Sequence, residues 1–417
     1  MNMETLITLN KIVTVLFVIC YGYQLLYIPL SLWKRKQVLK SQSMVNRYAV
    51  LICARNERTV IADLIDCLKH QSYPQQLIDI YVMADNCTDD TAAIARRHGA
   101  TVFERHNRIE VGKGFALNAL LQRIWEHDRS YDGYFVFDAD NILPENYIEM
   151  MNNKFMEGND IVTSYRNSKN FFSSWIAAGH AIWFLRESIY VNFPRSLLGL
   201  SCGVSGTGFM FSRKIAEELK GWPFHCLTED VEFTVHEVCK GRKVAFCKEA
   251  QIYDEQPISL KESVNQRLRW SRGSLQVIEK YFRKLLMGSL DGNLSCLDML
   301  VNLSSAIILC IISVFLNVLI IIGQLIETGS LLNTLNSLIE MFAAGYLTFF
   351  IIGMIVTVSE RKRIIASKAR LILYTFTFPL YVMTNVPITV ASVLVPVSWK
   401  PIRHSCSLSR LKFKIPQ

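Results

Sequence analysis

The stretch Tyr-Phe-Val-Phe-Asp-Ala-Asp at residues 134–140 decides how the middle of the chain folds. Four large apolar residues in a row predict a buried strand, and two carboxylates, Asp138 and Asp140, stand at its end. In open α/β sheets, ligands bind just outside the carboxyl ends of the strands. Two carboxylates at alternate positions there suit a hard divalent cation such as Mg²⁺ or Mn²⁺, held together with substrate phosphates. Taken alone, such a pair could equally be a solvated turn.

Similar apolar runs alternate with helical ones on the amino-terminal side of this stretch. The apolar runs are residues 48–53, 78–84 and 100–104, and the helical ones are residues 57–71, 88–99 and 114–125. This alternation predicts βαβ units and therefore an α/β domain with a mostly parallel sheet, which we place at residues 46–258. Glu57 and Asp85 follow the first two strands, so we expect both at the same edge of the sheet as Asp138.

Two further motifs bring charged side chains to predicted helix starts. Lys113 stands directly before a helix, where a lysine and free backbone N–H groups form a natural anion pocket, although a surface lysine would look the same. The spacing of an ATP-binding phosphate loop is absent. Glu229 and Asp230 follow Thr228 in apolar surroundings, where a carboxylate with a raised pKa could act as general base on a hydroxyl. A helix N-cap is the alternative explanation.

The run Gln266-Arg-Leu-Arg269-Trp270 closes this domain. It belongs to a segment, residues 259–290, in which basic and apolar residues are interleaved, as in helices that lie on a membrane surface. Arg269 could neutralise a leaving pyrophosphate, and Trp270 could stack on a sugar ring.

Long apolar stretches flank the domain. Hydrophobic residues make up 51% of the 417 residues and mean hydropathy is +0.22, which fits a soluble part joined to membrane segments. We predict an N-terminal transmembrane helix within residues 1–36, two more at 299–326 and 341–358, and a transmembrane or re-entrant segment at 371–399. The last stretch contains three prolines, so we expect it to bend and return the tail.

Basic residues follow the first span and fill the loop at 360–370 and the tail at 400–417. The positive-inside rule therefore places the N-terminus outside and the domain and tail in the cytosol, in a multi-pass protein of the cell membrane. The net charge of +9 is compatible with nucleic acid, anionic lipid or a phosphorylated substrate. We expect membrane lipids and a phosphorylated substrate, and no nucleic acid. Eleven cysteines without a C-x-x-C pair argue against a zinc site or a disulfide framework.

Taken together, these motifs resemble the membrane-integrated family-two glycosyltransferases, a group that includes cellulose, hyaluronan and poly-N-acetylglucosamine synthases. The resemblance implies a GT-A fold, a UDP-sugar donor and a divalent metal, Mg²⁺ or Mn²⁺. It also implies a role for each motif residue. Glu57 and Asp85 would hold the uracil and its ribose, Lys113 the nucleotide, and Asp138 and Asp140 the diphosphate and its metal. Gln266 and Arg269 would bind the diphosphate, and Trp270 would lie at the acceptor end. Asp230 would be the base that deprotonates the acceptor hydroxyl, with Glu229 as the second catalytic carboxylate.

The function implied is inverting transfer of glucose or N-acetylglucosamine from a UDP-sugar to a growing polysaccharide, in a processive reaction with export of the chain. The alternative is a glycolipid synthase that transfers one sugar to a membrane lipid. Because few membrane segments are available, a channel would have to be tight or be assembled from more than one chain, as a homo-oligomer or with an accessory membrane subunit.

Overall fold

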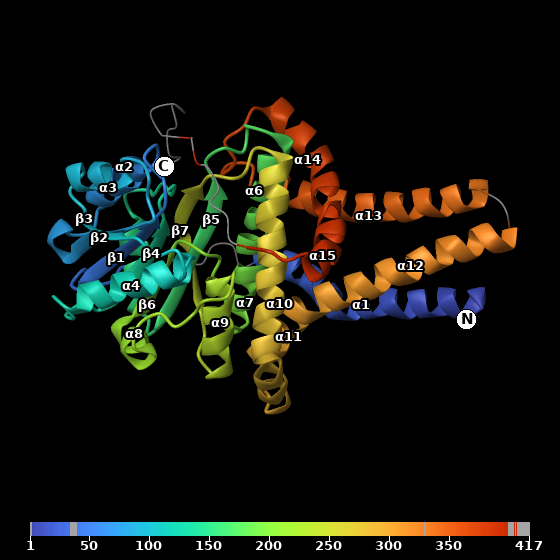
Figure 1. The fold of residues 1–417 in the computed structure, drawn as a ribbon, viewed down its shortest axis with the longest axis horizontal. Helices are drawn as coiled ribbons and strands as arrows, with labels where there is room; N and C mark the ends of the chain where they lie inside the picture. The colour runs from blue at the N-terminus through green and yellow to red at the C-terminus, as the bar shows by residue number, and fades with distance from the viewer. Residues whose placement is uncertain (1, 34–39, 329–330, 399–403, 405, 407–417) are drawn as a thin grey trace.

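The computed structural model describes residues 2–33, 40–328, 331–398, 404 and 406. Its centre is a seven-stranded sheet of order β3-β2-β1-β4-β6-β5-β7 (Figure 1). The strands are β1 (Tyr48–Ala54), β2 (Ile78–Asp85), β3 (Thr101–Arg105), β4 (Gly133–Asp138), β5 (Ile161–Ser168), β6 (Phe209–Ser212) and β7 (Ala245–Asp254). Only β6 runs antiparallel to its two neighbours, so the predicted α/β fold with a mostly parallel sheet is confirmed.

The register of the sheet brings the motif residues to one edge. Cys53 in β1 lies opposite Asp138 in β4, and Ala54 lies opposite Ala84 in β2. The carboxyl ends of these three strands are therefore level, and the segments that follow them start side by side.

Helices cover both faces of the sheet. They include α2 (Ile61–Lys69), α3 (Thr91–Arg97), α4 (Lys113–Trp125), α5 (Tyr147–Phe155), α6 (Trp175–Glu187), α8 (Arg213–Leu219) and α9 (Glu229–Cys239). One apolar core contains residues of α4, α6 and α9, and the other contains residues of α2 and α5. Helix α2 is shorter than the predicted 57–71, because the carbonyl of Glu57 accepts the N–H groups of both Val60 and Ile61 in a turn before it.

Helix α6 runs through a π turn at Ser188–Asn192 into the short α7 (Phe193–Leu197). Farther along the chain, α10 (Leu260–Leu290) is one continuous helix that stands between the sheet domain and the long helices that project from it (Figure 1). Its buried residues, among them Ser263, Arg267, Gly273 and Val277, form one stripe along the helix.

Four helical segments are long and apolar enough to cross a membrane: Met3–Trp33, Leu294–Ile326, Thr334–Ser359 and Lys368–Leu394. They comprise α1 (Met3–Trp33), α11 (Leu294–Leu300), a π turn at Val301–Ser305, α12 (Ala306–Thr328), α13 (Leu331–Ser359), α14 (Lys368–Met383) and α15 (Asn385–Leu394). Figure 1 shows α1, α12 and α13 projecting from the domain in one direction, whereas α14 and α15 run crosswise to them, alongside α10.

The helical hydrogen-bond pattern of the last apolar stretch is interrupted between α14 and α15, at Thr384, whose backbone stays in the right-handed helical region. Pro387 lacks the N–H that would continue the helical ladder there, which is the physical reason for the break. Which side of a membrane the tail occupies stays a prediction, because most of residues 400–417 lies outside the described residues.

Candidate active site

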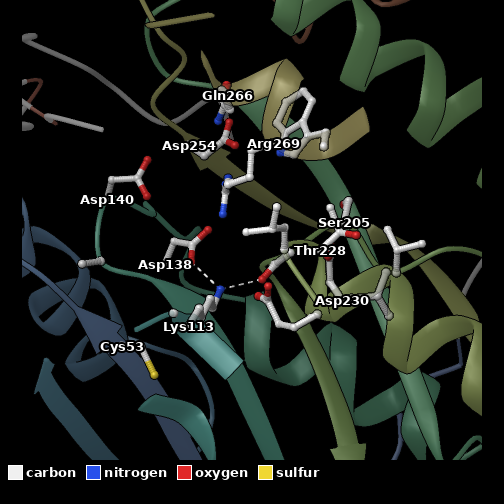
Figure 2. Close-up of a pocket in the computed structure, with 18 of the residues that line it drawn as sticks. Cys53, Lys113, Asp138, Asp140, Ser205, Thr228, Asp230, Asp254, Gln266 and Arg269 are labelled. Atoms are coloured by element: carbon white, nitrogen blue, oxygen red, sulfur yellow. Dashed lines mark hydrogen bonds and ion pairs between the residues drawn. The ribbon is translucent and has the colours of Figure 1, made fainter. Parts of the chain in front are cut away.

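A hollow of about 320 Å³ opens at the carboxyl edge of the sheet, between β1, β4, α6, α9 and α10. The ten site residues predicted from the sequence all line it: Glu57, Asp85, Lys113, Asp138, Asp140, Glu229, Asp230, Gln266, Arg269 and Trp270. Figure 2 shows Lys113, Asp138 and Arg269 pointing into the same space, with Asp230 at its border. The structure thus brings together motifs that are more than 200 residues apart in sequence (Glu57 and Trp270).

Lys113 stands at the start of α4 and bridges two elements of the site. Its Nζ donates to Oδ1 of Asp138 and, at 2.7 Å, to the carbonyl oxygen of Gly206. Burial lowers the pKa of the ammonium, but the neighbouring carboxylates of Asp138 and Glu229 outweigh this and raise it. The site therefore holds a fixed positive charge beside the strand end.

Gly114 allows this placement of Lys113. A Cβ at position 114 would lie 2.0 Å from the carbonyl oxygen of Phe224, a contact that only a backbone shift could relieve. We expect Gly114→Ala to cost about 1–3 kcal/mol of unfolding free energy and to reduce turnover. Thermal melts should show this loss. A matched Gly203→Ala variant, whose new Cβ would meet nothing within 4 Å, should melt like the wild type, and equal melting of the two variants would contradict the argument.

The carboxylates of Asp138, at the end of β4, and of Asp140, just after it, each accept a hydrogen bond on one oxygen. Oδ1 of Asp138 accepts from Lys113, and Oδ2 of Asp140 accepts the backbone N–H of Glu255 at 2.6 Å. Their other oxygens make no hydrogen bond to a described residue. Among the described residues no group of three or more His, Cys, Asp and Glu side chains forms a metal cluster. An ion here would take two protein carboxylates and fill its shell with phosphate and water, which fits the habit of Mg²⁺.

Glu229 and Asp230 occupy the first turn of α9. The side chain of Thr228, at the N-cap, makes no capping hydrogen bond, so a polar cap does not account for this motif. Burial and the charge of Asp230 raise the pKa of Glu229 to about 7, and burial also raises the pKa of Asp230. The pair therefore has the raised proton affinity expected of a general base.

The raised pKa values predict the pH dependence of turnover. A base must be deprotonated, so kcat/KM should be full above the apparent pKa of the pair and fall about tenfold per pH unit below it. Glu229, whose pKa is about 7, titrates together with Asp230 as a pair. The decline in kcat/KM should therefore begin near neutral pH, which a profile from pH 5.5 to 8.5 would show. Glu229→Gln removes a neighbouring charge and should move the decline of the remaining activity to lower pH. A wild-type profile that is flat down to pH 5.5 would contradict this reading.

Helix α10 supplies the opposite wall of the hollow. It approaches α9 closely because residue 273 is glycine: a Cβ there would lie 2.5 Å from Oγ1 of Thr228. Arg269 makes no hydrogen bond or ion pair with a described residue, and Oε1 of Gln266 is buried without a partner among them. Polar groups placed this way in a cavity are available to a ligand.

The far end of the hollow lies at the loops after β1 and β2. Asp85 is fixed by Nη1 of Arg105 at 2.7 Å, and Nδ1 of His404 lies 3.0 Å from both carboxylate oxygens of Glu57. Burial lowers the pKa of His404, but Asp140 and Glu57 outweigh it and raise that pKa to about 10. His404 of the C-terminal tail thus lies in the site. The sequence analysis described this tail only as basic and did not predict that one of its residues contacts Glu57.

Sequence reasoning also missed a group of residues on β5 and α6. Arg166 donates to Asp254 at 2.6 Å and to the carbonyl oxygen of Ser205 at 2.7 Å. Glu187 lines the hollow and makes no hydrogen bond or ion pair with a described residue, and burial raises its pKa. Trp183 and Phe184 lie beside it in the lining. These residues belong to no motif. The one sequence signal for them is the presence of charged residues within otherwise apolar segments.

Behind Trp270 the structure is filled by side chains. The Trp270 ring packs edge-on against His180 and Phe184, with centroids 5.7 and 5.8 Å apart. Next to them, Tyr381 of α14 and Arg267 of α10 are 1% and 3% exposed, and Nη1 of Arg267 donates to the carbonyl oxygen of Tyr381 at 3.1 Å. The described residues therefore close the hollow on the side of α14.

The curated proteins whose sequences are similar to this chain include glycosyltransferases. The chain is 27% identical over 263 residues to "Probable glycosyltransferase YdaM" of Bacillus subtilis, covering 56% of this chain and 57% of that one. It is 24% identical over 244 residues to "Beta-monoglucosyldiacylglycerol synthase" of Synechocystis, covering 56% and 49%. A shorter stretch of 109 residues is 33% identical to "Cellulose synthase A catalytic subunit 9 [UDP-forming]" of Oryza sativa subsp. indica, covering 25% and 10%. The chain thus spans about half the length of the first two relatives.

Among solved structures, the mannosyltransferase PcManGT from Pyrobaculum calidifontis, in complex with GDP-Man and Mn²⁺, has a TM-score of 0.59 at 15% identity, covering 92% of this chain and 99% of that one. This likeness concerns the fold and confirms the expected GT-A architecture. A family model described as "Glycosyltransferase like family 2" matches residues 46–273, which is more than half of the chain and includes every motif discussed above. The chain belongs to glycosyltransferase family 2.

Proposed function

We propose that this chain transfers a hexose from a UDP-sugar, with inversion at the anomeric carbon, to a hydroxyl group of a membrane lipid. The observation that carries the proposal is the arrangement around one hollow. Lys113 and Arg269, which has no hydrogen-bond or ion-pair partner among the described residues, face the same space as Asp138. The pair Glu229 and Asp230, whose pKa values are raised, borders this space. Cations that can hold a diphosphate therefore lie beside a base that can activate a hydroxyl.

The chemistry is a single displacement. Asp230 takes the proton of the acceptor hydroxyl while the acceptor oxygen attacks the anomeric carbon, and the bond from that carbon to the diphosphate breaks. Lys113, Gln266 and Arg269 donate hydrogen bonds to the departing UDP, whose negative charge grows as it leaves. A divalent ion bound by Asp138 and Asp140 would supply further positive charge to the diphosphate. Glu57 and Asp85, at the far end, would orient the nucleoside.

A lipid acceptor is supported by the filled wall behind Trp270. A growing polysaccharide would have to pass beyond Trp270 toward the membrane helices, where Tyr381 of α14 packs against His180 of α6 and Arg267 of α10. The Synechocystis relative, described as a monoglucosyldiacylglycerol synthase, points the same way. The processive polysaccharide synthase remains the second candidate, favoured by the Gln-x-x-Arg-Trp motif and by the match to a cellulose synthase subunit.

The location proposed is a cell membrane, with the domain on the cytosolic side. The four candidate spans support the membrane, and the basic residues that follow α1 and α13 in the sequence favour the cytosolic orientation. A homo-oligomer or an accessory subunit would be needed only by the polysaccharide candidate, since only that product requires a channel.

The test is to incubate membranes carrying the protein with radiolabelled UDP-glucose, UDP-N-acetylglucosamine or GDP-mannose, each with Mn²⁺ or Mg²⁺. Label in a solvent-extractable lipid from one of the UDP-sugars, absent when EDTA is added, is the expected result. Label in a polymer that elutes early from a size-exclusion column would replace the lipid acceptor by the polysaccharide candidate. Incorporation from GDP-mannose alone would overturn the proposed donor.

A further inference from the structure

A second and larger hollow, of about 930 Å³, lies away from the catalytic hollow. It is formed where α13 ends, where the turn at residues 360–367 follows, and where α14 begins, with Lys248 of β7 at one side. The two hollows share no lining residue. Figure 1 shows α14 crossing beside the domain end of α13, so this hollow lies at the junction of the domain and the membrane helices. Its volume is in the range of small-molecule sites.

One part of the lining is apolar. Phe350 and Met354 come from α13, and Ile372 and Phe376 come from α14. Met354, Ile372 and Phe376 are 41%, 60% and 51% exposed, and they belong to helices that are apolar enough to cross a membrane. This side of the hollow is therefore open to hydrocarbon where the helices meet a bilayer.

The other part of the lining is basic. Four of its residues are cationic, Lys248, Arg361, Lys362 and Arg363, and the one acid is Glu360. Glu360 is 1% exposed and already neutralised, because Nη1 of Arg363 lies 2.6 Å from its Oε2 and the hydroxyl of Tyr165 donates to the same oxygen at 2.9 Å. Arg363 and Glu360 thus neutralise each other, and Arg361 and Lys362 add two positive charges to the lining. Arg361 and Lys362 are exposed, and neither makes an ion pair with a described residue.

The combination of these two parts restricts the ligand. A soluble phosphate would match the charge but leave the apolar wall unused, and a neutral lipid would leave the charge unmatched. A phospholipid with a net negative charge matches both, because its phosphate can lie among the basic side chains while an acyl chain follows α13 and α14. Basic pockets between membrane helices on the cytoplasmic side are known to bind such headgroups.

We propose that this hollow binds one anionic phospholipid from the leaflet that faces the catalytic domain, with its phosphate at Arg361 and Lys362. The same turn makes hydrogen bonds with β5 of the domain. The hydroxyl of Tyr165 donates to Glu360, and Nδ2 of Asn167 donates to the carbonyl oxygen of Arg363 at 3.0 Å. A lipid bound here would therefore lie next to the contact between β5 of the domain and the turn that joins α13 to α14. This inference does not depend on the sugar donor or acceptor.

The experiment uses the purified full chain in a mild detergent and counts retained lipids by native mass spectrometry after adding phosphatidylglycerol or phosphatidylcholine. The wild type should retain one phosphatidylglycerol in preference to phosphatidylcholine. The double variant Arg361→Gln, Lys362→Gln should bind it on the order of 30-fold more weakly, since each basic residue near a membrane surface contributes roughly fivefold to affinity. Both side chains are exposed, so folding should be unaffected.

A matched control makes the same charge change elsewhere. Arg96 and Arg97 are also adjacent, exposed arginines, but they lie on α3, far from the membrane helices (Figure 1). Arg96→Gln, Arg97→Gln should bind phosphatidylglycerol like the wild type. Equal binding by all three proteins, or equal binding of phosphatidylcholine, would overturn the proposal.

Two further measurements complete the test. A size variant tests the apolar side of the hollow, and competition by inorganic phosphate tests whether the hollow is a simple anion site. Met354→Trp puts a larger side chain into the hollow without changing its charge, and it should also weaken phosphatidylglycerol retention. Retention unchanged in this variant would overturn the placement of the acyl chain. Inorganic phosphate at millimolar concentration should compete poorly, and complete displacement of the lipid by phosphate would show a simple anion site instead.

Discussion

Asp230→Asn should reduce sugar transfer by about 10³-fold while leaving donor binding nearly intact. The substitution keeps the size and shape of the side chain but removes its ability to accept a proton. Because Asp230 borders the hollow in the first turn of α9, the loss should fall on kcat and not on KM for the UDP-sugar. Initial rates of label transfer at several donor concentrations, together with UDP binding by calorimetry, would measure both effects.

Glu229→Gln is the companion variant for this prediction. If Asp230 is the base, Glu229→Gln should retain far more activity than Asp230→Asn, because the neighbouring acid acts only on the charge of the pair. The reverse order of activities would assign the base to Glu229. More than a tenth of wild-type turnover in Asp230→Asn would show that neither proton affinity nor position makes this residue essential.

Arg269→Ala should lower kcat by about 10²- to 10³-fold, the usual cost of removing one preorganised donor from a developing negative charge. Arg269 lines the hollow and makes no hydrogen bond or ion pair with a described residue. Its removal therefore breaks no hydrogen bond or ion pair with those residues, and the melting temperature should change little. Arg269→Lys should recover part of the activity, since it restores the charge without the two-pronged geometry.

The control for Arg269 is available on the same helix. Arg272 lies three residues farther along α10, does not line the hollow and contacts the carbonyl oxygen of Ser392 at 3.5 Å. Arg272→Ala removes the same charge from α10 and should keep most of the turnover. A similar loss in both variants would mean that the general positive charge of α10 matters and that Arg269 has no specific role.

The fold of the domain could be predicted because its signals are local. A buried strand such as β4 is an unbroken apolar run, and α2 repeats its buried residues at helical spacing, Ile61, Leu64, Ile65 and Leu68. That the ten proposed site residues line one hollow could be predicted for a related reason. They stand at the ends of these elements, and parallel strands in adjacent register must bring their carboxyl ends together.

The sequence by itself thus determined the class of fold, the presence of helices long and apolar enough to cross a membrane, and which acids and cations meet at one hollow. It did not determine the second half of the site or the course of the last helices. Arg166 and Glu187 gain their place only because β5 and α6 pack beside the motif loops. The closed wall depends on Arg267 meeting Tyr381, and the second hollow depends on α14 crossing α13. These contacts join residues with no local pattern in common, so their energies exist only when distant segments are packed, and only the tertiary structure decides them.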